Sequence, residues 1–320
     1  MKAILYTTYG PPEVLQLQEI EKPCPGAGEV LVQVHASSIN AIEWRRFTMP
    51  RPMVRIFGGG LLEPKDKTIG GDLAGRVEAV GADVKRFRPG DEVFGVRRGA
   101  FAEYVCATED KLVHKPANVS FEAAATVPIA GLTALQALRD KGKIQTGQNV
   151  LIYGSGGGVG TFAVQIAKSF GTEVTAVCGP RNVDIARCIG ADHVIDYSRG
   201  NFSDYGQQFD LIVGVNGYHS IFDFKRALKP DGKYVMVGGT VKQLLQAMFV
   251  APFLSKFGSR KMLGMMTRPT VEDLIVLKDL LEAGKIVPAI DRCFPLTETV
   301  DAIHYVLDGH PRGKVVLSIA

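Results

Sequence analysis

The stretch NVLIYGSGGGVGTFAVQIAK, residues 149–168, decides the fold of this 320-residue chain. Five strand-like residues lead into a glycine-rich turn, and a helical pattern with Phe162, Ile166 and Phe170 on one side follows at once. Glycines let the backbone turn tightly and let a phosphate approach without meeting a Cβ, while the helix N-terminus offers free N–H groups and partial positive charge. The stretch therefore predicts a site for the pyrophosphate of a dinucleotide.

This turn departs from the strict G-x-G-x-x-G pattern. Counted back from Gly160, its first position is Ser155, which gives S-x-G-x-x-G. A merely flexible turn is the alternative, and the flanking strand and helix argue against it. The residues predicted to bind the cofactor here are Ser155, Gly157, Gly158, Val159 and Gly160.

The end of the next predicted strand bears on the choice of cofactor. An NAD-preferring site places Asp or Glu there to bind the ribose hydroxyls, whereas this chain has Cys178, followed by Gly-Pro and Arg181. A guanidinium can pair with a 2′-phosphate in bidentate fashion, so the sequence favours NADPH over NADH. Two alternatives stay open: Arg181 is a solvated loop residue, or Asp184 folds back onto the ribose and NADH is used.

The pattern around the glycine turn defines two domains. From 148 to 240 strands alternate with helices, which predicts a parallel sheet. Residues 1–120 show short extended runs between Pro and Gly, as in a β-rich barrel-like module. The tail also reads as β, so we predict an α/β protein in which a doubly wound dinucleotide-binding domain, 121–268, interrupts a β-rich module, 1–120 and 269–320. A helix is predicted over 271–285, with Leu274, Leu277 and Leu281 on one stripe, at the point where the chain re-enters the β-rich module.

Composition and charge exclude several classes of protein. With 46% hydrophobic and 22% charged residues the chain is neither disordered nor a disulfide scaffold. A net charge of +4 without long charge runs disfavours nucleic-acid binding. Five scattered cysteines without a C-x-x-C pair predict a reducing, cytoplasmic location. Neither the start, MKAILYTTYG, nor the apolar segment 244–266, which Pro252 and Lys256 interrupt, reads as a signal peptide or a membrane span. That segment reads as lid, interface or core.

Further stretches carry a family resemblance. In chain order they are SSINAIEW, GGDLAGRVEAVG, PGDEVFGV, AFAEYV, VPIAGLTALQAL, IGADHVIDY and GHPRGKVVLSI. With the glycine turn they make the chain resemble the medium-chain dehydrogenases/reductases, in the zinc-independent quinone oxidoreductase, or zeta-crystallin-like, branch. The resemblance covers essentially the whole length. It implies a GroES-like module interrupted by a Rossmann domain, with the active site between them, and a homodimer.

The resemblance also bears on zinc. Zinc-dependent relatives hold the catalytic metal with a Cys at the position of Asn40, a His at that of Gly71 and a Cys near Ile129, and this chain has none of these ligands. Their four-cysteine structural lobe is missing too. An improvised site stays open, although no pair has metal-ligand spacing; its candidate ligands are Cys24, His35, Cys106 and His114.

Without zinc nothing polarises an alcohol, so the substrate should supply its own electron sink. Quinones and α,β-unsaturated carbonyls do so, which predicts an NADPH-dependent reductase that transfers hydride to one of them, largely by positioning. An NAD(P)-dependent alcohol or aldehyde dehydrogenase is the second reading. A non-enzymatic NADPH-binding or RNA-binding protein is the third.

The resemblance assigns further residues. Asn40 would point toward the nicotinamide, with a turn-stabilising Asn as the alternative, and Thr133 would join it. Trp44, Phe94 and Ile129 would line the substrate cleft, although Trp44 and Phe94 also suit an ordinary core. The remaining cofactor residues are Tyr197 at the adenosine phosphate, or alternatively a half-buried strand residue, and Asn216, Gly238, Gly239 and Lys314 toward the nicotinamide.

The chain departs from its relatives beside Asn40. Where they read N-x-x-D, it has Asn40 and then Glu43, followed by a loop private to this subgroup. No residue in the cleft stretches is an obvious general acid, so solvent or the ribose hydroxyl would deliver the proton.

Overall fold

The computed structural model describes all residues of the chain except 51, 53, 56–59, 61, 216–218, 240–242, 244–245, 257 and 310. The chain divides into two compact units. The first comprises Met1–Ile129, Pro269–Glu282 and Ile290–Ala320, and the second comprises Ala130–Arg268 and Ala283–Ala289. The sequence places the divisions at residues 120 and 268, and in the structure they fall after Ile129 and Arg268.

A seven-stranded sheet forms the centre of the first unit. Its order is β14-β15-β3-β4-β5-β7, and β6 also pairs with β3. All of its pairs are antiparallel except β14 with β15. A separate hairpin consists of β1 (Lys2–Tyr6) and β2 (Leu15–Glu19). The bounds of the sheet are β3 (Glu29–Ser38), β4 (Asp72–Val80), β5 (Glu92–Val96), β6 (Tyr104–Thr108), β7 (Leu112–His114), β14 (Ile290–Pro295) and β15 (Lys314–Ser318).

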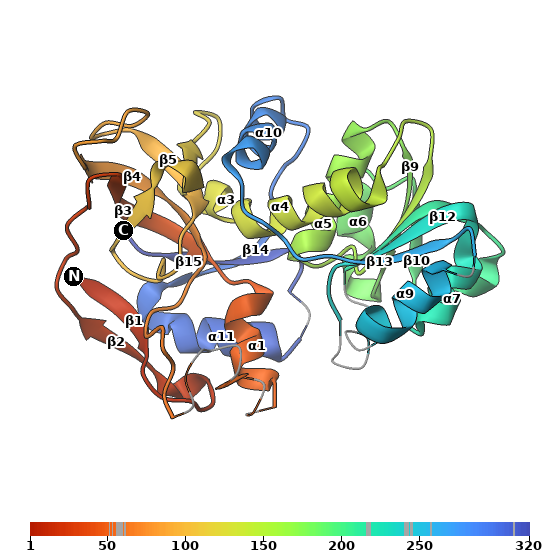
Figure 1. Ribbon diagram of the computed structural model, residues 1–320, viewed down its shortest axis with the longest axis horizontal. Coiled ribbons are helices and arrows are strands. Elements are labelled where there is room, and N and C mark those ends of the chain that lie inside the picture. Colours follow the sequence, from red (N-terminus) through yellow and green to blue (C-terminus); the bar gives the residue numbers. More distant parts are fainter. Residues whose placement is uncertain are drawn as a thin grey trace. The chain divides into compact units, whose positions relative to one another are not determined.

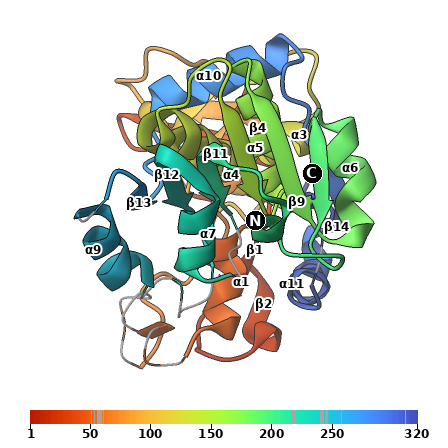
Figure 2. The same cartoon turned by 90° about the vertical axis from the view of Figure 1, so that its right-hand side faces the viewer.

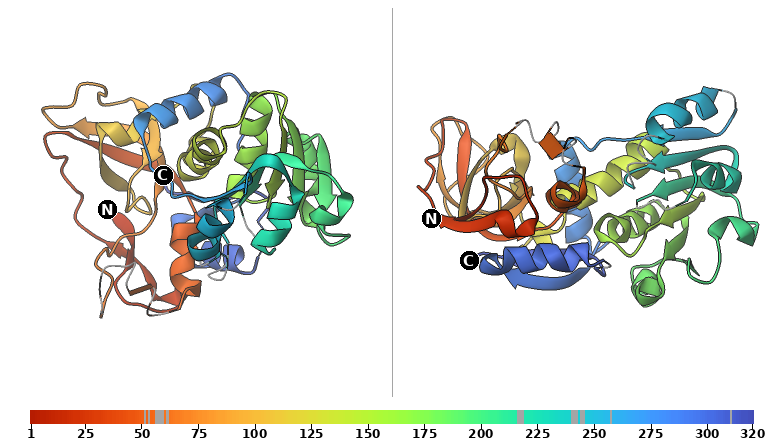
Figure 3. Two further views of the ribbon diagram at one scale, coloured as in Figure 1. Left: turned by 45° about the vertical axis from the view of Figure 1, so that its right-hand side comes forward. Right: turned by 90° about the horizontal axis from the view of Figure 1, so that it is seen from below.

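Short helices surround this sheet (Figure 1). They are η1 (Pro12–Val14), α1 (Ala41–Thr48), η2 (Glu109–Lys111), α3 (Phe121–Ala125), α10 (Val271–Glu282), η7 (Leu296–Glu298) and α11 (Thr299–Leu307), while α4 (Pro128–Leu135) crosses the division. The predicted stripe of α10 is confirmed, since Leu274, Leu277 and Leu281 are buried. Helix α11 contacts both α1 and β15, and α1 (orange) and α11 (blue) can be followed in the two views of Figure 3. Helix α1 is therefore packed against the C-terminal part of the chain.

The second unit contains a six-stranded parallel sheet in the order β10-β9-β8-β11-β12-β13. In sequence order this is 3-2-1-4-5-6, the order of the doubly wound dinucleotide-binding fold. The predicted Rossmann domain is thus confirmed. The strands are β8 (Asn149–Tyr153), β9 (Glu173–Cys178), β10 (His193–Asp196), β11 (Phe209–Gly214), β12 (Leu228–Met236) and β13 (Lys261–Gly264).

Helices α6 and α9 lie at opposite ends of this sheet, beside β10 and β13 (Figure 2). On one face the rings of Phe202, Phe224 and Tyr234 stack, with centroids 5.2 and 4.5 Å apart. The helices of the unit are η3 (Gln136–Gly142), α5 (Gly158–Ser169), η4 (Pro180–Asn182), α6 (Val183–Cys188), η5 (Phe202–Tyr205), α7 (Ile221–Ala227), η6 (Gln246–Val250) and α9 (Ala251–Lys256).

The apolar segment 244–266 supplies part of this core. Ala251 of α9 and Met262 of β13 are buried in it, whereas Phe249 and Phe253 are exposed. Among the described residues, no helix is long and apolar enough to cross a membrane.

Candidate active site

The glycine turn between β8 and α5 is tight at two of its residues. Gly154 has φ +85°, a left-handed conformation that favours glycine. A Cβ on Gly160 would lie 2.1 Å from the carbonyl oxygen of Gly154. Only glycine at position 160 therefore lets α5 begin this close to the end of β8.

At Gly157 the same turn is open. Gly157 caps α5, and the nearest atom to a Cβ placed on it is the Gly154 oxygen, 3.9 Å away. The N–H groups of the following residues, Gly158 and Val159, belong to the first helical turn, where the helix supplies no acceptors. An anion approaching Gly157 would meet these donors and the positive end of the helix. The turn thus has the features that a dinucleotide pyrophosphate requires.

Ser155 and Cys178 have buried side chains beneath the turn. The hydroxyl of Ser155 donates to the carbonyl oxygen of Val177, 3.2 Å away, and Ser155 has no exposed surface. Cys178 is 2% exposed, and burial raises the pKa of its thiol. The Ser155 hydroxyl thus ties the turn to β9, and neither side chain has appreciable surface to present to a cofactor.

The loop after β9 brings several predicted residues together. The Tyr197 hydroxyl lies 2.7 Å from the point that a Cβ on Gly179 would occupy, so its ring covers Gly179, close to the exposed Arg181 of η4. Tyr197 is itself half-exposed. Asp184, the alternative ribose ligand, lies 3.6 Å from Arg187 and its side chain is 96% exposed.

Sequence reasoning missed Asn182. A Cβ on Gly156 would lie 2.5 Å from Asn182 Cγ, so this side chain covers Gly156. Its Oδ1 atom is buried without a hydrogen-bond partner. The only signal in the sequence was its place directly after Arg181.

Other residues predicted near the nicotinamide follow β12. Gly238 and Gly239 follow its carboxyl end after Val237, whose N–H donates to Gly214 O at 2.9 Å. Asn216 lies outside the described residues. Thr133 is 8% exposed, and its hydroxyl lies 2.8 Å from that of Thr267.

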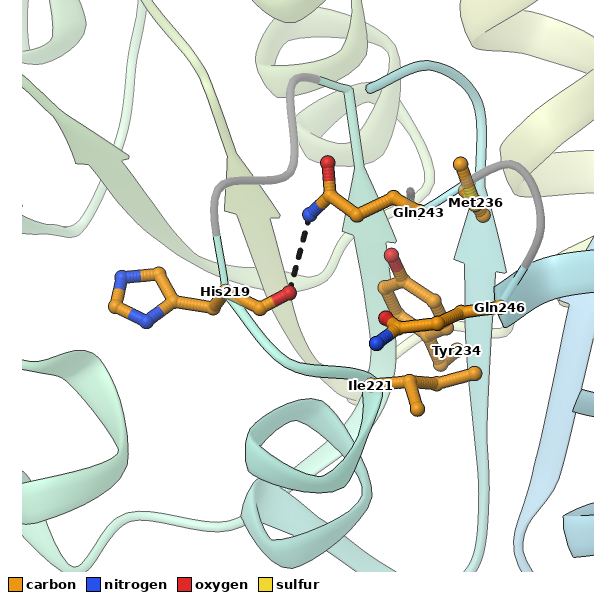
Figure 4. A pocket seen from close by; sticks show the side chains of 6 residues that line it. All are labelled: His219, Ile221, Tyr234, Met236, Gln243 and Gln246. Carbon is orange, nitrogen blue, oxygen red and sulfur yellow. Dashed lines mark hydrogen bonds between the residues drawn. The ribbon is translucent and has the colours of Figure 1, made fainter. Parts of the chain in front are cut away.

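A small pocket lies along the C-terminal part of β12 (Figure 4). Gln243 Nε2 spans part of it and donates to the carbonyl oxygen of His219 at 3.0 Å. Burial raises the pKa of Tyr234, so this phenol stays neutral. The lining residues are His219, Ile221, Tyr234, Met236, Gln243 and Gln246.

In the first unit, Asn40 is the centre of a buried polar cluster. It caps α1 directly after β3 and is 8% exposed. Its Nδ2 donates to Asp72 Oδ2 at 2.8 Å and to the Ser38 carbonyl at 3.3 Å, and its Oδ1 accepts from Lys314 Nζ at 2.6 Å. Both Nδ2 hydrogens are directed at protein acceptors, so Nδ2 would bind a ligand only by exchanging one of its bonds, of which the one to Ser38 is the longer.

Asp72 is fully buried at the start of β4, and four donors surround its carboxylate. Oδ1 accepts from the N–H of Ile129 at 2.8 Å. Oδ2 accepts from Ser38 Oγ at 2.6 Å, from Asn40 and, at 3.5 Å, from the ammonium of Lys314. Lys314 is 3% exposed and also donates to the Ile39 carbonyl at 3.2 Å. The residue predicted as a weak cofactor ligand therefore has its hydrogens directed at protein acceptors.

Glu43 completes this cluster. It is 3% exposed, and Oε2 accepts from the backbone N–H of Asn40 at 2.7 Å. Burial, and next the charge of Asp72, raise the pKa of its carboxyl to about 8, against the opposing effects of the Asn40 hydrogen bond, Lys314 and Arg46. Glu43 and Asp72 were not predicted as site residues, although both lie in the quoted stretches SSINAIEW and GGDLAGRVEAVG.

Three residues predicted to line the substrate cleft lie in the first unit. Phe94 is fully buried in β5 and has no surface to present to a ligand. Trp44 is half-buried against the core cluster around Tyr6 and Leu317. Ile129 is half-buried, and its Cδ1 lies 2.5 Å from the point that a Cβ on Gly71 would occupy.

The residues at the zinc position of relatives do not fit a zinc ion. Ile129 and the Glu43 carboxyl, whose Oε1 lies 3.3 Å from the same point, crowd the place of a side chain on Gly71. The Asn40 amide and the Asp72 carboxylate are bonded to protein groups. Over the described part of the chain, no three His, Cys, Asp or Glu residues are grouped to hold a metal. Of the improvised set, His35 stacks on Phe121 with centroids 4.3 Å apart.

Known protein families match both the N-terminal and the C-terminal part of the chain. Residues 26–117 match the alcohol dehydrogenase GroES-like domain, and residues 189–317 match the zinc-binding dehydrogenase family. The chloroplastic quinone-oxidoreductase QR1 of Triphysaria versicolor is 35% identical, over 99% of this chain and 98% of that protein. The 2-methylene-furan-3-one reductase of Solanum lycopersicum is 32% identical, over 99% and 79%.

A solved structure agrees with these matches. The quinone oxidoreductase from Coxiella burnetii superposes with a TM-score of 0.87 at 32% identity, covering 100% of this chain and 99% of its own. The GroES-like module joined to a Rossmann domain is thereby confirmed, and the fold implies an oxidoreductase with a nicotinamide cofactor. The chain belongs to the medium-chain dehydrogenase/reductase superfamily, among the quinone oxidoreductases.

Proposed function

We propose that the chain is an NADPH-dependent reductase that transfers hydride to a quinone or an α,β-unsaturated carbonyl without zinc. One observation carries the proposal: Asn40, at one of the positions that bind zinc in relatives, is held in a hydrogen-bonded cluster with Asp72 and Lys314, and the other two positions, Gly71 and Ile129, carry no ligand side chain. That cluster offers no Lewis acid to an alcohol. The acceptor must then stabilise its own charge.

The reaction balances with a single proton. When bound, the nicotinamide supplies hydride from C4 and becomes the oxidised cofactor. The acceptor becomes an enolate or hydroquinone anion, which takes up one proton. The protein contributes binding and orientation, which can supply much of the rate enhancement when the reacting atoms are held close.

The glycine turn and the loop after β9 would hold the dinucleotide. Gly157, Gly158 and Val159 present the open helix N-terminus to the pyrophosphate. The exposed Arg181 comes two residues after Gly179, which the half-exposed Tyr197 covers, and its guanidinium would suit the 2′-phosphate of NADPH. Asp184 is 96% exposed and its ion pair with Arg187 is at the surface, so NADH binding through Asp184 is the alternative that the assay below tests.

Two relatives support the acceptor class by their names. One is named a quinone oxidoreductase and another a 2-methylene-furan-3-one reductase, whose substrate name describes an activated enone. A cytoplasmic location stays a prediction, since relatives are named as chloroplastic or mitochondrial. The homodimer also stays a prediction.

The test is a steady-state assay. NADPH and NADH oxidation would be followed at the reduced-nicotinamide absorbance band against a panel of quinones, enones and simple aldehydes. We expect turnover with quinones or enones, little with saturated aldehydes, and a higher kcat/KM for NADPH. Turnover confined to alcohols or aldehydes would contradict the proposal.

A further inference from the structure

Glu43 is a buried carboxyl for which the proposed reaction has no use. Its backbone lies one helical turn from Asn40, and its Oε2 accepts from the Asn40 N–H at 2.7 Å. With an exposed fraction of 3%, the side chain has almost no contact with solvent. An ionised carboxylate there would lose its hydration, which is costly unless a partner compensates.

The cluster contains one cation close to two carboxyls. The Lys314 ammonium is 3.5 Å from Asp72 Oδ2 and donates to Asn40 Oδ1 and the Ile39 carbonyl. Asp72 is fully buried and accepts four hydrogen bonds, an arrangement that suits an anion. Arg46, the other cation acting on Glu43, lies on the same helix and also interacts with the ring of Tyr6. The ammonium thus balances Asp72, and Glu43 is the excess negative charge if it ionises.

We propose that Glu43 is a positioning residue for Asn40 and that it acts in its protonated, uncharged form. A neutral carboxyl still accepts the Asn40 N–H through Oε2 and leaves Lys314 to Asp72 and Asn40. A carboxylate repels Asp72 and draws the ammonium away from Asn40 Oδ1, so the capping residue of α1 loses its 2.6 Å bond. This inference rests on the proposed function insofar as Asn40 serves the hydride acceptor.

The sign of the pH dependence follows from burial. Burial and the Asp72 charge raise the pKa of Glu43 to about 8 from an ordinary value of 4.5. The folded chain therefore holds a proton that the unfolded chain releases between these two values. The stabilising contribution of neutral Glu43 is complete below pH 4.5 and is lost as the pH rises toward 8. Activity that requires the neutral form declines above 8.

The first test is a pair of pH profiles. For wild type, kcat/KM with an enone acceptor should fall about tenfold from pH 6.5 to pH 9, because about a tenth of Glu43 remains protonated one unit above its pKa. For Glu43→Gln, which cannot ionise, kcat/KM should change less than twofold over the same pH range. Glu43→Asp introduces the Asp of the N-x-x-D pattern, which can still ionise, so its kcat/KM should also fall at alkaline pH. Glu272→Gln, an exposed carboxyl of α10, is the matched control and behaves as wild type.

Urea unfolding gives a second readout that needs no activity. Between pH 5 and 8, the unfolding equilibrium constant of wild type should rise about tenfold per pH unit relative to Glu43→Gln. If wild type turns over no acceptor, the proposed function fails, and the Glu43 inference is decided by this measurement. An alkaline fall shared by wild type and Glu43→Gln, a flat wild-type profile or a pH-independent stability difference would overturn it. If Glu43→Gln does not fold, loss of the alkaline fall in Glu43→Asp would overturn it as well.

Discussion

The ammonium of Lys314 lies 2.6 Å from the side-chain oxygen of Asn40, a residue 274 positions earlier in the chain. Lys314 begins β15, and Asn40 joins β3 to α1. The hydrogen bond therefore links the last strand to the start of α1. By the family resemblance, Asn40 stands at the position where zinc-dependent relatives carry a metal-binding cysteine. Lys314 also pairs with the Asp72 carboxylate, 3.5 Å away, so a buried ion pair lies beside Asn40.

Replacing Lys314 should destabilise the protein strongly. Lys314→Met leaves the Asp72 carboxylate buried without its ammonium, and breaking such a pair typically costs about 3–5 kcal/mol. Urea unfolding at pH 7 measures the loss. Lys65→Met, at an exposed lysine of the same unit, is the control and should change the unfolding free energy by less than about 0.5 kcal/mol.

The double variant Asp72→Asn/Lys314→Met tests the origin of that loss. Removing both charges leaves no unpaired buried ion, so it should be more stable than Lys314→Met alone. Equal stability of the single and double variants would show that lost packing, not the unpaired charge, is responsible.

Two glycines of the turn should respond differently to alanine. Gly160→Ala places a Cβ 2.1 Å from a backbone oxygen, so α5 must shift, at a cost of about 1–3 kcal/mol. Gly157→Ala meets nothing within 3.9 Å and should leave the unfolding free energy nearly unchanged. Its methyl group faces the proposed phosphate site, however, and should weaken NADPH binding. Calorimetric titration and thermal unfolding of both variants separate the two effects, and the reverse pattern would contradict the assignment.

Arg181→Ala should affect one cofactor more than the other. Loss of the guanidinium removes a partner of the 2′-phosphate, so the KM for NADPH should rise about tenfold or more, while that for NADH stays within about twofold. Arg226→Ala, at an exposed arginine of α7, is the control and should leave both KM values unchanged. An equal rise for both cofactors would remove the role assigned to Arg181.

The parallel sheet and the glycine turn were predictable because their signals are local. Strand and helix patterns flank the turn within residues 149–168, and Gly160 follows from the close approach of α5 to β8. The buried stripe of α10 was equally visible in its spacing. The structure of the segment 244–266 was not predictable, since a continuous apolar pattern does not distinguish the helix α9 from the strand β13.

The cluster around Asn40 was predictable only in part. The resemblance identified Asn40, but its partners Asp72 and Lys314 come from strands far apart in the sequence, and their pairing depends on the tertiary fold. The resemblance assigned Lys314 weakly to the cofactor, and the sequence does not reveal that this lysine at a strand start is buried against Asn40 and Asp72. The burial of Glu43 could not be predicted for the same reason, since its 3% exposure depends on the tertiary fold.

Isotope transfer tests the central claim most directly. Protein treated with a chelator and shown by elemental analysis to be metal-free would be given NADPH carrying deuterium at the transferred C4 position, with an enone acceptor. The account predicts full turnover and one deuterium on the β-carbon of the product, seen by mass spectrometry and NMR. Activity that disappears with the chelator and returns with zinc, or deuterium that appears in the solvent instead of the product, would contradict it.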